Sequence, residues 1–135
     1  MLGAMDAAQA IADLKEISPQ VRDVVVIDPE GNPAGSSLGE EPAAARLADG
    51  ARRLLAAADE LRPGVAQLEA ATIVGSVFVV RDGARLIAAT TTPEPTVGLV
   101  FYDLKTCLRS IDEPAQKKPT GRRAPATDKA EDATA

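Results

Sequence analysis

The chain has 135 residues, which is enough for one domain with a single hydrophobic core. Its formal charge of −5 excludes nucleic-acid binding through a basic surface, and an aromatic content of 2% excludes an aromatic-lined ligand pocket. One cysteine and no histidine exclude a disulfide framework and the usual zinc sites.

The N-terminal part predicts a helix followed by two strands. The helix covers residues 6–17, with Asp6 as its N-cap, and residues 1–5 before it are expected to be flexible. Its apolar residues recur at helical spacing on a stripe about 120° wide, which is typical of a helix that faces a core. The β-branched run at 23–28 predicts a strand buried on both faces, and a turn leads from it into a short strand at 33–37.

A second helix is predicted from Glu41 to Arg62, where Pro63 and Gly64 end it. Its leucines and alanines cover an arc that approaches half of the helix circumference. One face of a sheet requires only about 100° of helix surface. The width of the arc therefore indicates a second apolar contact besides the core.

Three strands and a last helix complete the predicted domain. Residues 65–72 alternate between apolar and polar side chains, which predicts a strand with one wetter face. The nearly continuous apolar runs at 76–80 and 85–89 predict central strands, joined by a turn at 81–83. Gly75 indicates either a turn or a bulge before them.

The last helix is expected to begin after Thr96, its N-cap. The side chains that it directs to the core are Val97, Val100, Phe101, Leu104, Cys107, Leu108 and Ile111. Because strands buried on both faces need helices on both sides, the order α-β-β-α-β-β-β-α predicts a three-layer α/β sandwich over residues 6–111. Residues 112–135 contain no periodic apolar residue and predict a disordered charged tail, which is either an interaction segment or a solvated extension.

No catalytic, metal or cofactor site is predicted. Cys107 lies on the buried stripe of the last helix with no histidine to activate it. No Gly-x-x-x-x-Gly-Lys segment is available to hold a nucleotide. The longest apolar run, at residues 73–80, is too short to span a bilayer, and the first six residues lack the features of a signal peptide. We therefore expect a cytoplasmic protein that is not an enzyme and does not insert into a membrane.

The order of the elements and several segments resemble the Roadblock/LC7 (dynein light chain roadblock) family. The resemblance rests on the hairpin at 24–31, the alanine- and leucine-rich central helix, the turn at 78–83 and the last helix at 98–104. It implies an α+β fold in which a five-stranded antiparallel sheet has the central helix on one face and the two terminal helices on the other. The alanine-rich composition is typical of bacterial, and in particular actinobacterial, proteins.

The resemblance also implies a function in protein binding, because many bacterial members scaffold or regulate small Ras-like GTPases. It implies a homodimer that forms through the central helix and the adjacent edge strand. The residues that match this interface are Leu47, Ala48, Ala51, Leu55 and Ala58 on the helix, and Val65, Gln67 and Glu69 on the strand.

A GTPase partner is expected at two further groups of residues. Leu99, Tyr102 and Thr106 lie opposite the core stripe of the last helix, and aromatic side chains are common in binding hot spots. Arg52 and Arg53 on the central helix could approach the phosphates if the protein accelerates GTP hydrolysis. The sequence leaves two other functions open, namely an adaptor that is not coupled to a GTPase and a small-molecule sensor or weak enzyme.

Overall fold

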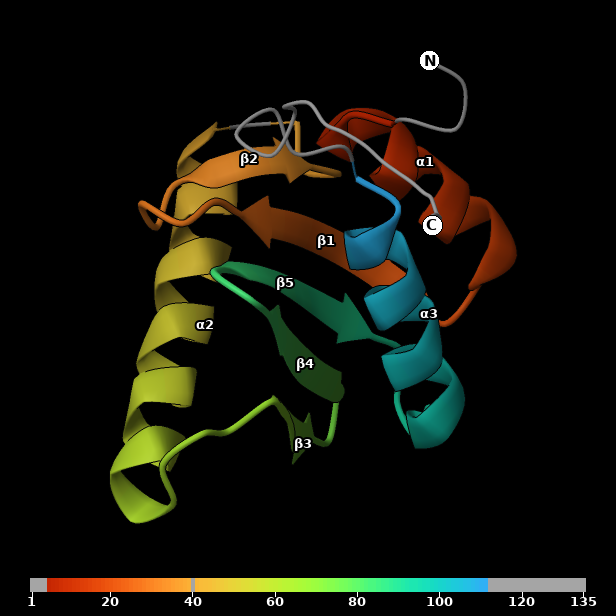
Figure 1. The fold of residues 1–135 in the computed structure, drawn as a ribbon. Helices are drawn as coiled ribbons and strands as arrows, with labels where there is room; N and C mark the ends of the chain where they lie inside the picture. Colours follow the sequence, from red (N-terminus) through yellow and green to blue (C-terminus); the bar gives the residue numbers. More distant parts are fainter. Residues whose placement is uncertain (1–4, 40, 112–135) are drawn as a thin grey trace, which may run out of the picture.

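The computed structural model describes residues 5–39 and 41–111 of the chain (Figure 1). The elements, in chain order, are α1 (Ala7–Ile17), β1 (Val21–Ile27), β2 (Pro33–Ser36), α2 (Glu41–Leu61), β3 (Gln67–Thr72), β4 (Gly75–Asp82), β5 (Arg85–Thr91) and α3 (Val97–Arg109). The predicted charged tail and residues 1–4 of the predicted flexible N-terminus lie outside the described residues. Met5 is described, and its backbone forms a parallel bridge with Ile111.

The strands form one sheet in the order β2-β1-β5-β4-β3, and every neighbouring pair is antiparallel. Helices α1 and α3 cover one face of the sheet and α2 covers the other, so the predicted three-layer α+β architecture is confirmed. The two edges of the sheet are β2 and β3. Among the described residues, no helix is both long enough and apolar enough to cross a membrane.

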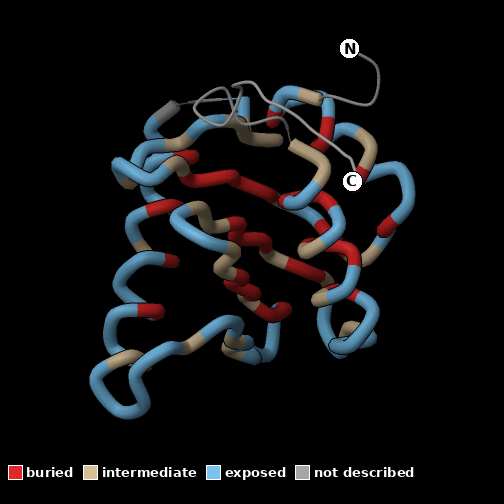
Figure 2. Tube along the Cα trace, viewed as in Figure 1, coloured by how far each residue is buried: buried red, intermediate tan, exposed pale blue. Residues whose placement is uncertain are grey.

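The larger core lies between the sheet and the pair α1 and α3 (Figure 2). Its largest side chain, Phe78 on β4, is fully buried and packs edge-on against Phe101 of α3, with 4.9 Å between the ring centroids. Aliphatic side chains from β1, β4 and β5 surround this pair. The N-terminus of α1 is capped as predicted, because Asp6 Oδ1 accepts a hydrogen bond from Gln9 N at 2.9 Å.

The second core lies under α2 and is built largely from alanine. Ala44, Ala48, Ala51 and Leu55 of α2 pack on side chains from β1, β4 and β5, including Val25, Val79 and Ala88. Because β1, β4 and β5 supply side chains to both cores, their apolar runs are continuous rather than alternating, as the sequence predicts.

Several local predictions were wrong at the ends of elements. The turn between β4 and β5 lies at residues 83–84 rather than 81–83, because Arg81 and Asp82 still pair with β5. Thr96 is the N-cap residue of α3, as predicted, but its side chain forms no capping hydrogen bond, and its N–H donates to Gln20 Oε1 at 2.6 Å. Ile17 and Val97, predicted to be core residues, are exposed because they occupy the last position of α1 and the first of α3, where the apolar stripes end.

Candidate interaction surfaces

The apolar arc of α2 divides into two halves with different surroundings. One half, Ala44, Ala48, Ala51 and Leu55, is buried against the sheet. The other half contains Leu47 and Ala58, which are partly buried, and Leu54 and Leu61, which are exposed. Leu61 has 82% of its surface exposed, which is unusual for a leucine. The sheet of this protomer therefore uses only about half of the apolar surface that α2 offers.

The residues predicted for a dimer interface are divided in the same way. Ala48, Ala51 and Leu55 are buried inside the protomer, whereas the other five are accessible. These five are Leu47, Ala58 and Val65, which are partly buried, and Gln67 and Glu69, which are exposed on β3. Leu54 and Leu61 belong to the apolar arc that the sequence predicts, but not to the predicted interface. Their angle on the helical wheel, on the far side of Leu47 from Ala48 and Leu55, was the available signal.

Within residues 5–39 and 41–111, no strand pairs with the outer side of edge strand β3, so its backbone groups there are free. Arg81 N of β4 donates to Ala66 O at 2.8 Å, so Ala66 directs its carbonyl toward β4. Because successive residues of a strand direct their backbone groups to opposite sides, Gln67, Glu69 and Ala71 direct theirs to the open edge. An open edge of this kind is a template for pairing with another strand.

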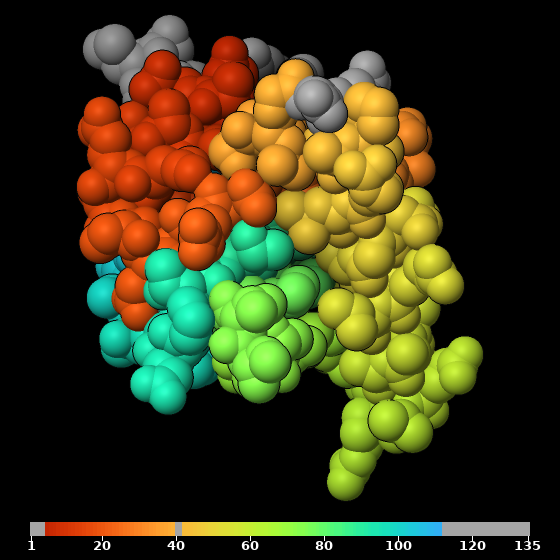
Figure 3. All heavy atoms as spheres, turned by 180° about the vertical axis from the view of Figure 1, so that it is seen from behind, coloured from red at the N-terminus to blue at the C-terminus, as the bar shows by residue number. Residues whose placement is uncertain are grey.

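The face of the sheet under α2 is incompletely covered near this edge. Leu68, Ala70 and Val77 lie on that face and are only partly buried, whereas Phe78, on the opposite face of β4, is fully buried. Figure 3 shows why, since the C-terminal part of α2 protrudes from the body of the molecule beyond the β3–β4 hairpin. The uncovered face of β3 and β4 and the exposed half of α2 together form what we term the α2/β3 surface.

Asp59 holds the two parts of the α2/β3 surface in place. Its Oδ2 accepts a hydrogen bond from Arg81 Nη2 of β4 at 2.7 Å, and its Oδ1 accepts one from Val65 N at 2.9 Å. The hydrogen bond from Arg81 is the main reason that the pKa of Asp59 lies below its ordinary value, and the bond from Val65 acts in the same direction. The carboxylate thus ties the C-terminal turn of α2 to β4 and to the segment that leads into β3.

The residues predicted to bind a partner lie on two opposite faces of the molecule. Leu99, Tyr102 and Thr106 are exposed on α3. Arg52 and Arg53 are exposed on α2, across the sheet, where both form ion pairs with Asp49 at 3.2 and 3.5 Å. The fold therefore does not bring the two groups together on one protomer.

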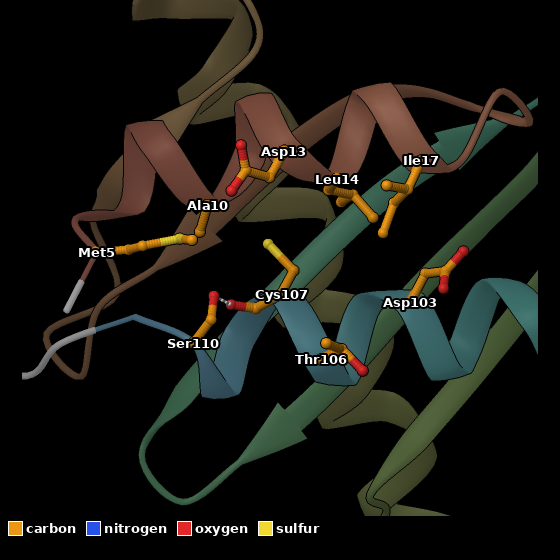
Figure 4. A pocket seen from close by; sticks show the side chains of 9 residues that line it. All are labelled: Met5, Ala10, Asp13, Leu14, Ile17, Asp103, Thr106, Cys107 and Ser110. Atoms are coloured by element: carbon orange, nitrogen blue, oxygen red, sulfur yellow. Dashed lines mark hydrogen bonds between the residues drawn. The ribbon is translucent and has the colours of Figure 1, made fainter. Parts of the chain in front are cut away.

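A small groove separates α1 from α3 and has a volume of about 130 Å³. Its lining residues, shown in Figure 4, include Met5, Ala10 and Leu14 on one side and Asp103 and Cys107 on the other. Burial, and secondarily the nearby Asp13 carboxylate, raise the pKa of the Cys107 thiol to about 11. The thiol is therefore protonated at neutral pH and is a poor nucleophile.

Comparison with protein-family models and with curated proteins finds no match. Comparison with solved structures finds several. A Roadblock/LC7 domain from Streptomyces avermitilis superposes with a TM-score of 0.68 at 16% identity, over 78% of this chain and 94% of that one. The gliding protein MglB from Thermus thermophilus gives a TM-score of 0.60 at 15% identity, over 82% of this chain and 89% of that one.

A further structure of MglB, described in a tetrameric arrangement, superposes with a TM-score of 0.60 at 14% identity. It covers 78% of this chain and 84% of that one. In each case the similarity covers about four fifths of this chain. The chain therefore has the Roadblock/LC7 fold, as its sequence predicts.

Proposed function

From the Roadblock/LC7 fold of this chain, we propose that it is a non-catalytic module that forms a homodimer and scaffolds or regulates a small Ras-like GTPase in the cytoplasm. The observation that carries the proposal is the α2/β3 surface. It combines the exposed half of the apolar arc of α2, a partly covered sheet face and an open strand edge in one place.

A second copy of the chain fits this surface because the surface can complement itself. A two-fold axis beside β3 joins the two open edges into one continuous sheet. The same rotation brings the α2 helix of the partner over the uncovered face of β3 and β4, antiparallel to the exposed half of α2. Leu47, Leu54, Ala58 and Leu61 then lie between the two helices. The tetrameric arrangement of an MglB structure is consistent with self-association in proteins of this fold.

A GTPase is the proposed partner because many bacterial proteins of the Roadblock/LC7 family, which this sequence resembles, scaffold or regulate such enzymes. The chain also shares its fold with MglB. The groove between α1 and α3 does not favour the alternative of a small-molecule sensor. Its volume of about 130 Å³, and the volume of about 280 Å³ of a more open pocket beside Arg52 and Arg81, are both below the roughly 300 to 1,000 Å³ that is usual for ligand pockets. The protein is proposed to act by binding rather than by chemistry, with Leu99, Tyr102 and Thr106 or Arg52 and Arg53 as the contact residues.

Two measurements test the proposal. Light scattering on the full chain at micromolar concentration is expected to give the mass of a dimer, and a monomer mass would contradict the dimeric part. A Ras-like GTPase from the same genome, loaded with GDP or with a non-hydrolysable GTP analogue, is then titrated with the protein. We expect tighter binding of one nucleotide state, because equal affinity for both states leaves no free energy for regulation.

The two candidate contact faces are separated by variants at exposed positions. Tyr102→Ala removes the aromatic ring from α3, and Arg53→Ala removes a guanidinium from α2. Because the two residues lie on opposite faces, loss of binding in one variant and not in the other identifies the face that the GTPase contacts. Full binding by both variants would contradict both assignments.

A further inference from the structure

We infer that two copies of the chain pair along β3 in one specific register, in which Ala70 of each protomer lies on the two-fold axis. The inference rests on the proposed homodimer and states which residues face each other within it. It also gives a role to the exposed tip of the β3–β4 hairpin, where Ile73 and Val74 have 95% and 76% of their surface in contact with solvent.

Symmetry leaves few possible registers. In an antiparallel pair, residues that face each other lie on the same side of the sheet, and side chains alternate between the two sides along a strand. A strand that pairs with its own copy must therefore have a residue, and not the midpoint between two residues, on the axis. For an axis near the middle of β3, this residue is Leu68, Glu69 or Ala70.

The charge of Glu69 disfavours the register centred on it. Ser76 Oγ donates to Glu69 Oε2 at 2.8 Å, which holds the carboxylate close to the sheet on the side of α1 and α3. With Glu69 on the axis, two such carboxylates face each other directly, and like charges in that position are destabilising. With Ala70 on the axis, each Glu69 instead faces the partner's Ala71, which carries no charge.

The backbone of Val65 disfavours the register centred on Leu68. That register places Val65 opposite the partner's Ala71, where its N–H is needed for the ladder between the strands. The same N–H already donates to Asp59 Oδ1 at 2.9 Å. In addition, the hairpin tip then extends beyond β3 of the partner toward its Pro63, so that Ile73 and Val74 remain exposed.

The register centred on Ala70 has neither defect. The free N–H and C=O groups of Glu69 pair with those of the partner's Ala71, and the symmetric pair forms on the other side of the axis. The hairpin tip lies beside the partner's Ala66 and Gln67, so that the dimer covers Ile73 and Val74. At the axis, the two Ala70 methyl groups are small enough to meet without displacing the helices above them.

Disulfide formation between single cysteines measures the register directly. In a Cys107→Ala background, Ala70→Cys is compared with Leu68→Cys, which lies on the same face two residues away. In the inferred register the two Cβ atoms at position 70 are about 4.5 to 5.5 Å apart, close to disulfide geometry. The two residues at position 68 are offset by four residues, or roughly 13 Å along the strand, and cannot form a disulfide.

We expect mild oxidation to convert Ala70→Cys to a covalent dimer at least about tenfold faster than Leu68→Cys, as seen on a non-reducing gel. Urea unfolding of both reduced variants shows that each is folded. If light scattering shows a dimer but crosslinking is faster at position 68, or absent at both positions, the register is wrong and the proposed dimer still stands. A wild-type protein that is monomeric by mass would overturn both.

Discussion

Replacing Leu61 with alanine is expected to weaken the dimer without weakening the protomer. Leu61 is the last residue of α2 and has 82% of its surface exposed, so it contributes almost nothing to the core. Leu→Ala removes three carbon atoms, worth about 2.4 kcal/mol of transfer free energy when fully buried. Scaled by the exposed fraction, each protomer loses about 2 kcal/mol at the interface.

A symmetric dimer contains this position twice, so the loss reaches about 4 kcal/mol if the partner covers Leu61 completely and about 2 kcal/mol if it covers half. At about 1.4 kcal/mol for each factor of ten, the dissociation constant rises by roughly 30-fold to 1,000-fold. Sedimentation equilibrium over a range of concentrations measures this change. Urea unfolding, carried out below the dissociation constant, is expected to be the same for variant and wild type within about 0.5 kcal/mol.

Leu99→Ala is the matched control, because Leu99 is a helical leucine with 49% of its surface exposed on α3, across the sheet from α2. It is expected to leave the dissociation constant unchanged. If the wild type is dimeric and Leu61→Ala associates as tightly as Leu99→Ala, the exposed half of α2 does not form the interface.

Three further predictions concern the fold. Gly75 has a φ of +146°, and a Cβ there would lie 2.0 Å from Thr91 O. Gly75→Ala is therefore expected to lower the free energy of unfolding, measured by urea titration, by more than about 3 kcal/mol. Gly98→Ala is the control and is expected to cause no such loss, because its added methyl group meets open space. Asp59→Asn is expected to lower the melting temperature at pH 7. Folding lowers the pKa of Asp59, so the carboxylate stabilises the fold above the ordinary aspartate pKa, and this stabilisation is lost as the pH falls through the pKa in the folded state. The difference in melting temperature between Asp59→Asn and wild type is therefore expected to disappear in acid. Cys107, with a pKa of about 11, is expected to react with a thiol reagent at pH 8 about 100-fold more slowly in the native protein than in urea, and equal rates would contradict its burial.

The sequence predicted the elements and the layers because both follow from local periodicity. The continuous apolar run in β1 and the alternation in β3 correctly separated a strand buried on both faces from a strand with one wetter face. The antiparallel order of the sheet came from the family resemblance rather than from any pattern in the residues. Errors at the ends of elements, as at Arg81 and Asp82, arose because the pairing of β4 with β5 extends further than the local turn residues indicate.

The candidate interface was predicted less well, and the reason is geometric. A helical wheel gives the width of an apolar arc but not the part of it that faces the sheet of the same protomer. Ala51 and Leu54 are neighbours on the wheel, yet one is buried and the other is exposed. The direction in which α2 crosses the strands decides between them, and that direction depends on how alanine methyl groups pack on β1 and β5. Nothing in the sequence predicted that the hairpin tip at Ile73 is exposed, since a pair of apolar residues usually indicates a core.

The bridge between Met5 and Ile111 has a consequence for how a dimer could be used. It places the entry and the exit of the folded chain side by side, near β2 and at the opposite edge of the sheet from β3 (Figure 1). In a dimer joined along β3, the two such points lie at the far ends of a ten-stranded sheet. In that dimer, the points at Met5 and Ile111 of the two protomers are separated by the full width of the sheet. Such a dimer would separate its two attachment points by a distance that the number of strands sets.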